Sequence, residues 1–113
     1  MFKCLFLYKI RNDMMADDYT FSVNKNMNQF ELVVDEDNIA FLEYYTDGKK
    51  IFLNHTEVPF DLRGRGFAAK LVEKSLEYCR ENNLIVVPAC SYVAHFIDDN
   101  PQWNDVLSEG YQM

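Results

Sequence analysis

Residues 58–68, VPFDLRGRGFA, join a β-type run to an amphipathic helical run. Gly64 and Gly66 permit a tight turn there, because glycine has no Cβ to restrict the backbone. The first amides of the helix that follows have no intrahelical acceptor, and the helix dipole adds positive potential at that end. Arg63 and Arg65 supply further donors. The stretch therefore predicts a loop that can receive a phosphate group.

Four β-type runs precede this loop. Asp47-Gly48 tolerates positive φ, so it predicts a tight hairpin between the last two runs. Pro59 lacks an N–H group and ends the final strand. The expected strands are Tyr19–Val23, Gln29–Val34, Ile39–Thr46 and Lys50–Val58.

The chain after the loop predicts a strand-helix-strand unit. Residues 66–82 have a helical period, with an apolar stripe formed by Ala68, Leu71, Val72, Leu76 and Cys79. Residues 84–87 are continuously apolar, which is typical of a parallel strand buried on both faces. Residues 91–98 predict a short helix that Ser91 caps and Asn100-Pro101 ends. Together these runs predict a mixed α/β fold.

Composition restricts the kinds of function. A chain of 113 residues suits one domain with one site, and its net charge of −7 disfavours nucleic acid as a partner. Three cysteines without CxxC spacing argue against a disulfide framework or a zinc site, so we expect a reducing, cytoplasmic location. The first ten residues do not resemble a signal peptide, and no run is long enough for a membrane helix.

The loop alone leaves two interpretations open, an anion site or a plain turn with two solvated arginines. Its spacing fits neither a dinucleotide fingerprint nor a Walker-type loop. It does match the R/Q-x-x-G-x-G/A pattern of GNAT acetyltransferases, as Arg63-x-x-Gly66-x-Ala68. With segments 55–59, 62–68 and 87–92, the chain resembles the small GNAT-like family of minimal N-acetyltransferases. The resemblance runs from about residue 19 to 107, so we expect residues 1–18 to be an extension and 19–113 the domain.

The resemblance implies a mostly antiparallel sheet with a βαβ unit, splayed between strands 55–58 and 84–90. Acetyl-CoA would lie in the gap and donate its acetyl group to an amine. No metal is implied. The residues implied to hold coenzyme A are Arg63, Gly64, Arg65, Gly66, Phe67 and Ala68 around the pyrophosphate, and the backbone near Val58 along the pantetheine arm.

Cys90 and His55 are the candidate catalytic residues. Cys90 follows a strand end, and the resemblance implies a position near the acetyl group, where its thiolate could form a thioester. An inert thiol that only lines the pocket, with direct attack by the amine, is the alternative. His55 is a candidate base for that thiol or for an ammonium, or else a structural histidine; alternation along the strand places it on one face with Leu53 and Glu57. Glu57 could orient or assist His55 or could face water, and we favour the second.

The other reactive side chains have plainer interpretations. His95 is expected at the surface and Cys79 in the core, and Cys4 carries no inference. Tyr44 and Tyr92 could each serve as a general acid for the leaving thiolate, but we favour packing roles for both. Two rival functions remain, a non-catalytic acyl-CoA-binding module and a small interaction domain whose loop binds nothing. The acceptor and the oligomeric state do not follow from the sequence.

Overall fold

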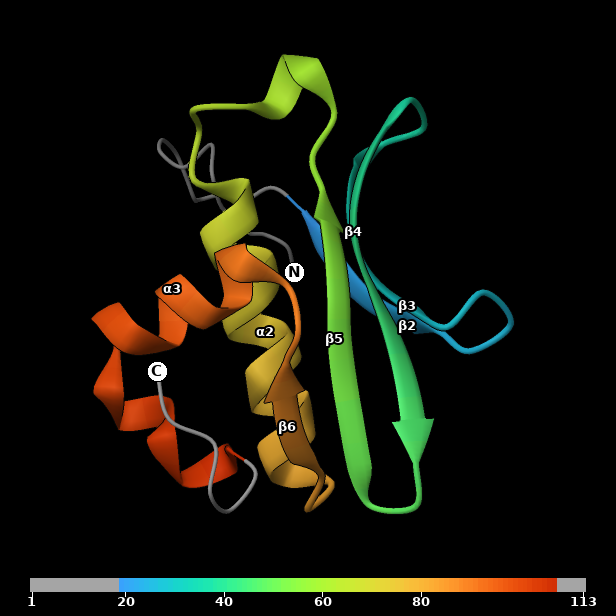
Figure 1. Cartoon of the computed structure of the whole chain (residues 1–113). Helices are drawn as coiled ribbons and strands as arrows, with labels where there is room; N and C mark the ends of the chain where they lie inside the picture. Colours follow the sequence, from blue (N-terminus) through green and yellow to red (C-terminus); the bar gives the residue numbers. More distant parts are fainter. Residues whose placement is uncertain (1–18, 108–113) are drawn as a thin grey trace, which may run out of the picture.

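The protein folds into one twisted sheet with its helices packed mainly against one face (Figure 1). The computed structural model describes residues 19–107. Within them the strand order is β2-β3-β4-β5-β6. The strands are β2 (Thr20–Asn24), β3 (Gln29–Asp35), β4 (Asn38–Asp47), β5 (Lys50–Glu57) and β6 (Ile85–Pro88). The α-helices are α2 (Phe67–Glu81) and α3 (Ser91–Asp99), and the 3₁₀ helices are η2 (Phe60–Leu62) and η3 (Pro101–Val106).

The strand pairing is the one that the sequence predicts. Strands β2 to β5 form antiparallel neighbours, and β5 pairs with β6 in parallel. The β4–β5 hairpin turns at Asp47-Gly48, where Gly48 has a φ of 62°. A mixed, mostly antiparallel sheet with a strand-helix-strand unit is thereby confirmed.

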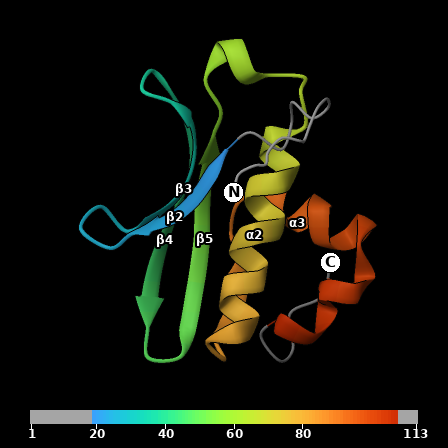
Figure 2. The same cartoon turned by 180° about the vertical axis from the view of Figure 1, so that it is seen from behind.

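Helix α2 covers the inner face of the sheet, as Figure 2 shows from behind. Its buried residues Leu71, Val72, Leu76 and Cys79 are part of the predicted stripe, and they join the aliphatic side chains of β3, β4, β5 and β6 in one core. Ala68, also predicted in the stripe, is only half-buried. This burial fixes the start of α2 relative to the end of β5, which is where the candidate loop lies.

Two details, one in the strand-helix-strand unit and one just after it, differ from prediction. Strand β6 is buried on one face only, because Val86 lies in the core while Ile85 is 38% exposed on a face that no described helix covers. Helix α3 begins at Ser91, so Cys90 and not Ser91 occupies the N-cap position. The predicted serine cap was therefore wrong by one residue.

The segment after α3 packs back onto α2. Arg80 on α2 donates from Nε to a carboxylate oxygen of Asp105 at 3.1 Å, and its guanidinium lies 4.2 Å from the ring centroid of Trp103. Leu107 forms a parallel bridge to Val86. These contacts hold η3 against α2 and Leu107 beside β6. Between residues 19 and 107, no helix has the length and apolarity to cross a membrane.

Candidate functional site

Strands β5 and β6 separate at one end of the sheet. Their parallel pairing ends at Leu53 and Pro88, and the Cys90 N–H donates a last hydrogen bond of 2.8 Å to the Leu53 carbonyl. β5 then continues to Glu57 while the chain after β6 turns into α3. Residues 54–57 thus have a backbone edge that no described strand pairs with on the β6 side. This is the splay that the family resemblance implies.

A β-bulge in β5 lies at the same level. Glu43 pairs with His55, but the next residue, Tyr44, pairs with Leu53, so Asn54 is an extra residue on β5. A bulge of this kind reverses the alternation of side chains. Leu53 is fully buried toward α2, whereas the His55 side chain is 55% exposed. The prediction that His55 and Leu53 share a face was wrong, because strict alternation does not hold across the bulge.

The loop between η2 and α2 forms an open helix N-terminus. Gly64 and Gly66 have φ values of 76° and 83°, a left-handed conformation that favours glycine. The first backbone bond of α2 joins the Lys70 N–H to the Gly66 carbonyl, so the three amides before Lys70 have no intrahelical acceptor. No side chain caps this end, and no acidic residue lies in the first turn of the helix. The amides remain free to bind an anion.

A cleft of about 340 Å³ opens beside these amides. It is lined by Val58, Leu62, Arg63, Gly64, Gly66, Phe67, Ala68, Ala69 and Tyr92. Loop, helix start and strand end thus meet at one cavity, and the start of α3 contributes its fourth wall through Tyr92. Burial raises the pKa of the Tyr92 phenol.

Both arginines of the loop donate hydrogen bonds to nearby backbone carbonyls. Arg63 donates from Nε to the Val58 carbonyl at 3.0 Å, and Arg65 donates to the Asp61 carbonyl at 3.4 Å. Both side chains are exposed, so their charges can turn toward a ligand. Two guanidinium groups and an uncapped helix N-terminus suit a pyrophosphate.

Cys90 lies at the base of the splay. Its Sγ is 3.5 Å from the Thr56 hydroxyl oxygen. Partial burial acts to raise the pKa of the thiol, but hydrogen bonding by the Thr56 hydroxyl and by the amides at the start of α3 outweighs it and lowers that pKa below its ordinary value. The Thr56 hydroxyl lowers the pKa more than the amides do, in keeping with the absence of a capping hydrogen bond from Cys90 to the helix. The thiolate, the reactive form of cysteine, is thereby favoured.

His55 and Glu57 form a pair on the opposite face of β5. The His55 Nε2 lies 2.8 Å from a carboxylate oxygen of Glu57, and a second carboxylate oxygen lies 3.9 Å from the Arg63 guanidinium. Among the described residues the structure gives Cys90 the partner Thr56 and gives His55 the partner Glu57, and does not bring His55 and Cys90 together. The expected solvent-facing Glu57 is instead the partner of His55.

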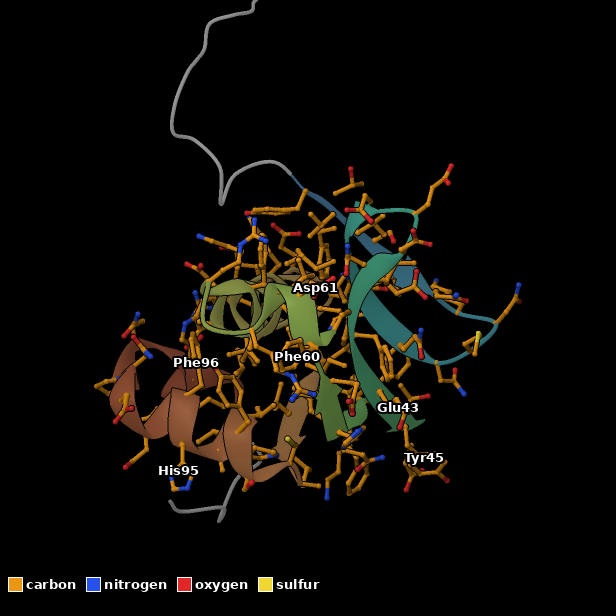
Figure 3. The ribbon with its side chains drawn as sticks, turned by 90° about the horizontal axis from the view of Figure 1, so that it is seen from above. Glu43, Tyr45, Phe60, Asp61, His95 and Phe96 are labelled. Atoms are coloured by element: carbon orange, nitrogen blue, oxygen red, sulfur yellow. The ribbon has the colours of Figure 1, made fainter. Side chains whose placement is uncertain are left out.

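The other candidates fall as follows. Cys79 is fully buried, and burial raises its pKa to about 12. His95 is exposed on α3 and points away from the sheet in Figure 3. Tyr44 packs against Phe30, with ring centroids 4.9 Å apart. Cys4 lies outside the described residues. No cluster of metal-binding side chains occurs within residues 19–107.

Sequence reasoning missed the two residues that set this geometry, Asn54 and Thr56. A bulge leaves no composition signal in the run 50–58, which alternates plausibly without one. Strict alternation would place Thr56 on the face opposite Leu53, so its contact with Cys90 was not foreseen.

Comparisons with known proteins agree with this arrangement. Residues 29–106 match the family model described as GCN5-related N-acetyl-transferase. Protein NATD1 of Bos taurus is 41% identical over 63 residues, a match that covers 55% of this chain and 56% of that protein. Protein NATD1 of Danio rerio is 31% identical over 80 residues, covering 69% of this chain and 73% of that protein. The chain thus spans little more than half the length of its bovine relative.

A solved structure extends the comparison to three dimensions. The solution structure of a GCN5-like protein from Staphylococcus aureus superposes with a TM-score of 0.62 at 29% sequence identity. The superposition covers 85% of this chain and 97% of that one. The two chains therefore share their fold over most of their length.

Proposed function

This chain belongs to the GCN5-related N-acetyltransferase family, and we propose that it transfers an acetyl group from acetyl-CoA to an amine. The observation that carries the proposal is the uncapped N-terminus of α2, which opens with two left-handed glycines into a cleft beside the splayed strands. A helix end of this kind binds phosphate groups. Val58 and Tyr92 line this cleft, and each is two residues from one member of the Thr56–Cys90 contact, so the cofactor and the thiol would lie close together.

The chain's own residues fit coenzyme A. The free amides at the start of α2 would bind the pyrophosphate, and the exposed guanidinium groups would neutralise its charge. The open edge of residues 54–57 would pair with the amide groups of the pantetheine arm. When bound, acetyl-CoA supplies an acetyl group already activated as a thioester. The residues assigned to this binding are Val58, Arg63, Gly64, Arg65, Gly66, Phe67 and Ala68.

Cys90 is proposed as the thiol at the reaction centre. In a covalent route its thiolate attacks the acetyl carbonyl and forms a new C–S bond, while the bond to the coenzyme A sulfur breaks and that sulfur leaves as a thiolate that takes up a proton. An amine then attacks the cysteinyl thioester and regenerates the Cys90 thiol. In a direct route the amine displaces coenzyme A itself, and Cys90 only lines the centre. The lowered pKa of Cys90 supports the covalent route.

His55 is proposed as the base for the acceptor and not for the thiol. Its Nε2 lies 2.8 Å from a carboxylate oxygen of Glu57, and this contact orients the ring. Both side chains are about half exposed on the outer face of β5. An acceptor amine arrives protonated at neutral pH and must lose a proton before it attacks. A histidine oriented by a carboxylate suits this step.

Intact-mass spectrometry with acetyl-CoA tests the proposal. Under native conditions we expect a complex with coenzyme A, and under denaturing conditions a mass increase of one acetyl group that is lost in Cys90→Ser. Binding without acetyl transfer to any amine would support the alternative of a non-catalytic CoA-binding module. If transfer persists in Cys90→Ser, the direct route is correct. If no complex forms, the cofactor assignment is wrong.

A further inference from the structure

The outer face of the sheet carries an exposed aromatic row. Tyr45, Phe52 and Val87 pair in register across β4, β5 and β6, so their side chains lie side by side on the face that α2 does not cover. The rings of Tyr45 and Phe52 are 5.9 Å apart, and Tyr45 is 59% exposed. Ile85, two residues before Val87 on the same face of β6, pairs with Lys50 in the neighbouring row and is 38% exposed. Figure 1 shows this part of the sheet without a covering helix.

The neighbouring row on the same face, on the side toward the splay, carries acidic side chains. Glu43 pairs with His55 across β4 and β5, and Glu57 follows on the same face. Figure 3 shows Glu43 and Tyr45 projecting together from one side of β4. Glu57 already has His55 as a partner, whereas no described cation forms an ion pair with Glu43. The two rows are two residues apart, about 7 Å along a strand.

We propose that these two rows are the acceptor surface and that they select a lysine side chain; this inference rests on the proposed acetyltransferase function. The apolar stem of a lysine would lie across Tyr45 and Phe52. Its ammonium would then reach the row of Glu43 and His55, next to the base of the splay. Long cationic side chains bind in this way, with the stem on apolar surface and the charge in a polar environment.

The chemistry of the surface favours lysine over other amines. A polyamine carries further charges along its stem, so it offers shorter apolar segments to cover the rings than a lysine does. An α-amino group lies directly on its peptide chain and has no stem to cover the rings. An exposed carboxylate at Glu43 attracts a cation, and the net charge of −7 increases the rate of encounter with one.

The position of the surface also suits the reaction. The Leu53 carbonyl accepts a hydrogen bond from the Cys90 N–H at the edge of β5 that faces β6. Two residues later, the bulge at Asn54 turns His55 to the outer face of the sheet. An ammonium beside Glu43 is therefore next to the proposed base. His55 takes the proton, the amine nitrogen bonds to the acetyl carbon, and the bond from that carbon to sulfur breaks with release of a thiol.

Three acceptors distinguish the possibilities: a peptide with one lysine and blocked termini, a lysine-free peptide with a free N-terminus, and spermidine. We expect kcat/KM to be highest for the lysine peptide and to fall as salt is raised. Glu43→Gln should lower kcat/KM for it about two- to fivefold, the value of an exposed ion pair. Tyr45→Ala should lower it by a similar factor, through loss of apolar contact.

Matched variants separate this surface from general effects. Glu81→Gln removes the same charge from an exposed position on α2, and Met27→Ala truncates an exposed apolar side chain in the β2–β3 turn. Both should leave the lysine peptide's kcat/KM unchanged, and none of the four variants should alter the Kd for coenzyme A.

The outcomes keep this inference apart from the proposed function. If coenzyme A binds and spermidine or the N-terminal peptide is acetylated better than the lysine peptide, the lysine assignment is wrong while the acetyltransferase function holds. An equal effect of Glu43→Gln and Glu81→Gln would also overturn it. If coenzyme A does not bind at all, both proposals are wrong.

Discussion

Charge reversal at Arg63 is the sharpest test of the proposed pyrophosphate site. Arg63 lines the cleft and lies beside the open amides of α2, and its side chain is 61% exposed. Arg63→Glu should therefore leave the fold intact while it replaces a cation at the mouth of the cleft with an anion. The perturbation acts on binding and very little on the core.

The magnitude follows from the contacts of the free protein. A hydrogen bond to a charged group is worth about 1.5–3 kcal/mol, but an exposed ion pair is worth only about 0.2–1 kcal/mol. Arg63 must also give up its 3.0 Å bond to the Val58 carbonyl and its approach to Glu57. In the variant, repulsion between the new carboxylate and the pyrophosphate weakens binding further and so offsets this reduction. We expect a net loss of about 1–2 kcal/mol, or roughly a 5- to 30-fold rise in the Kd for coenzyme A.

Isothermal calorimetry with coenzyme A measures this loss directly. Lys50→Glu is the matched control, because it changes the net charge by the same amount from an exposed position at the β4–β5 hairpin. Its Kd should stay near that of the parent protein, and the difference between the two variants should shrink as salt is raised. If Arg63→Glu and Lys50→Glu weaken binding equally, only the overall charge matters and the site lies elsewhere.

Three further perturbations test the thiol, the loop and the core. Iodoacetamide should label Cys90 before Cys79, since thiolate is the reactive form. The pH at which Cys90 reacts at half its maximal rate should lie below the ordinary thiol pKa, and Thr56→Val should raise that pH. Peptide mapping across a pH series measures both. Gly66→Ala places a Cβ at a φ of 83°, so thermal unfolding should report a loss of about 1–2 kcal/mol, and an unchanged Tm would contradict the left-handed geometry. Leu71→Ala should cost about 2–5 kcal/mol in a denaturant titration, and a loss below about 1 kcal/mol would show that α2 is not packed as described.

The strands and the main helix follow from local patterns. Alternation of polar and apolar residues, the Asp47-Gly48 turn and the helical stripe each act within about a dozen residues, and each element was placed to within two residues of its observed ends. The parallel partner of β5 also followed, because a strand-helix-strand order leaves few topologies. Burial of β6 on one face did not follow, since it depends on whether a helix covers the other face.

The candidate site could be predicted only in part from such local patterns. Both glycines of the loop and the start of α2 could be located, because positive φ and an open helix end have residue preferences that a sequence displays. The pairing of His55 with Glu57, and of Cys90 with Thr56, could not be located. Each depends on which face of β5 a residue occupies, and one inserted residue changes that face without changing the composition. The coenzyme A contacts, the reactive thiol, the domain boundaries and the cytoplasmic location stay predictions.

The bulge at Asn54 joins the two halves of the proposed site. Without it Thr56 would point to the outer face and His55 to the core, so the thiol would lose its hydroxyl partner and a titratable side chain would be buried. With it, β5 directs Thr56 toward Cys90 on one side and His55 toward the acceptor surface on the other. The bulge lies just past the last β5–β6 pair, where no neighbouring strand needs regular register. The splay therefore permits the irregularity that separates the Cys90 thiol from the proposed base, and it provides the gap in which we propose that the cofactor binds.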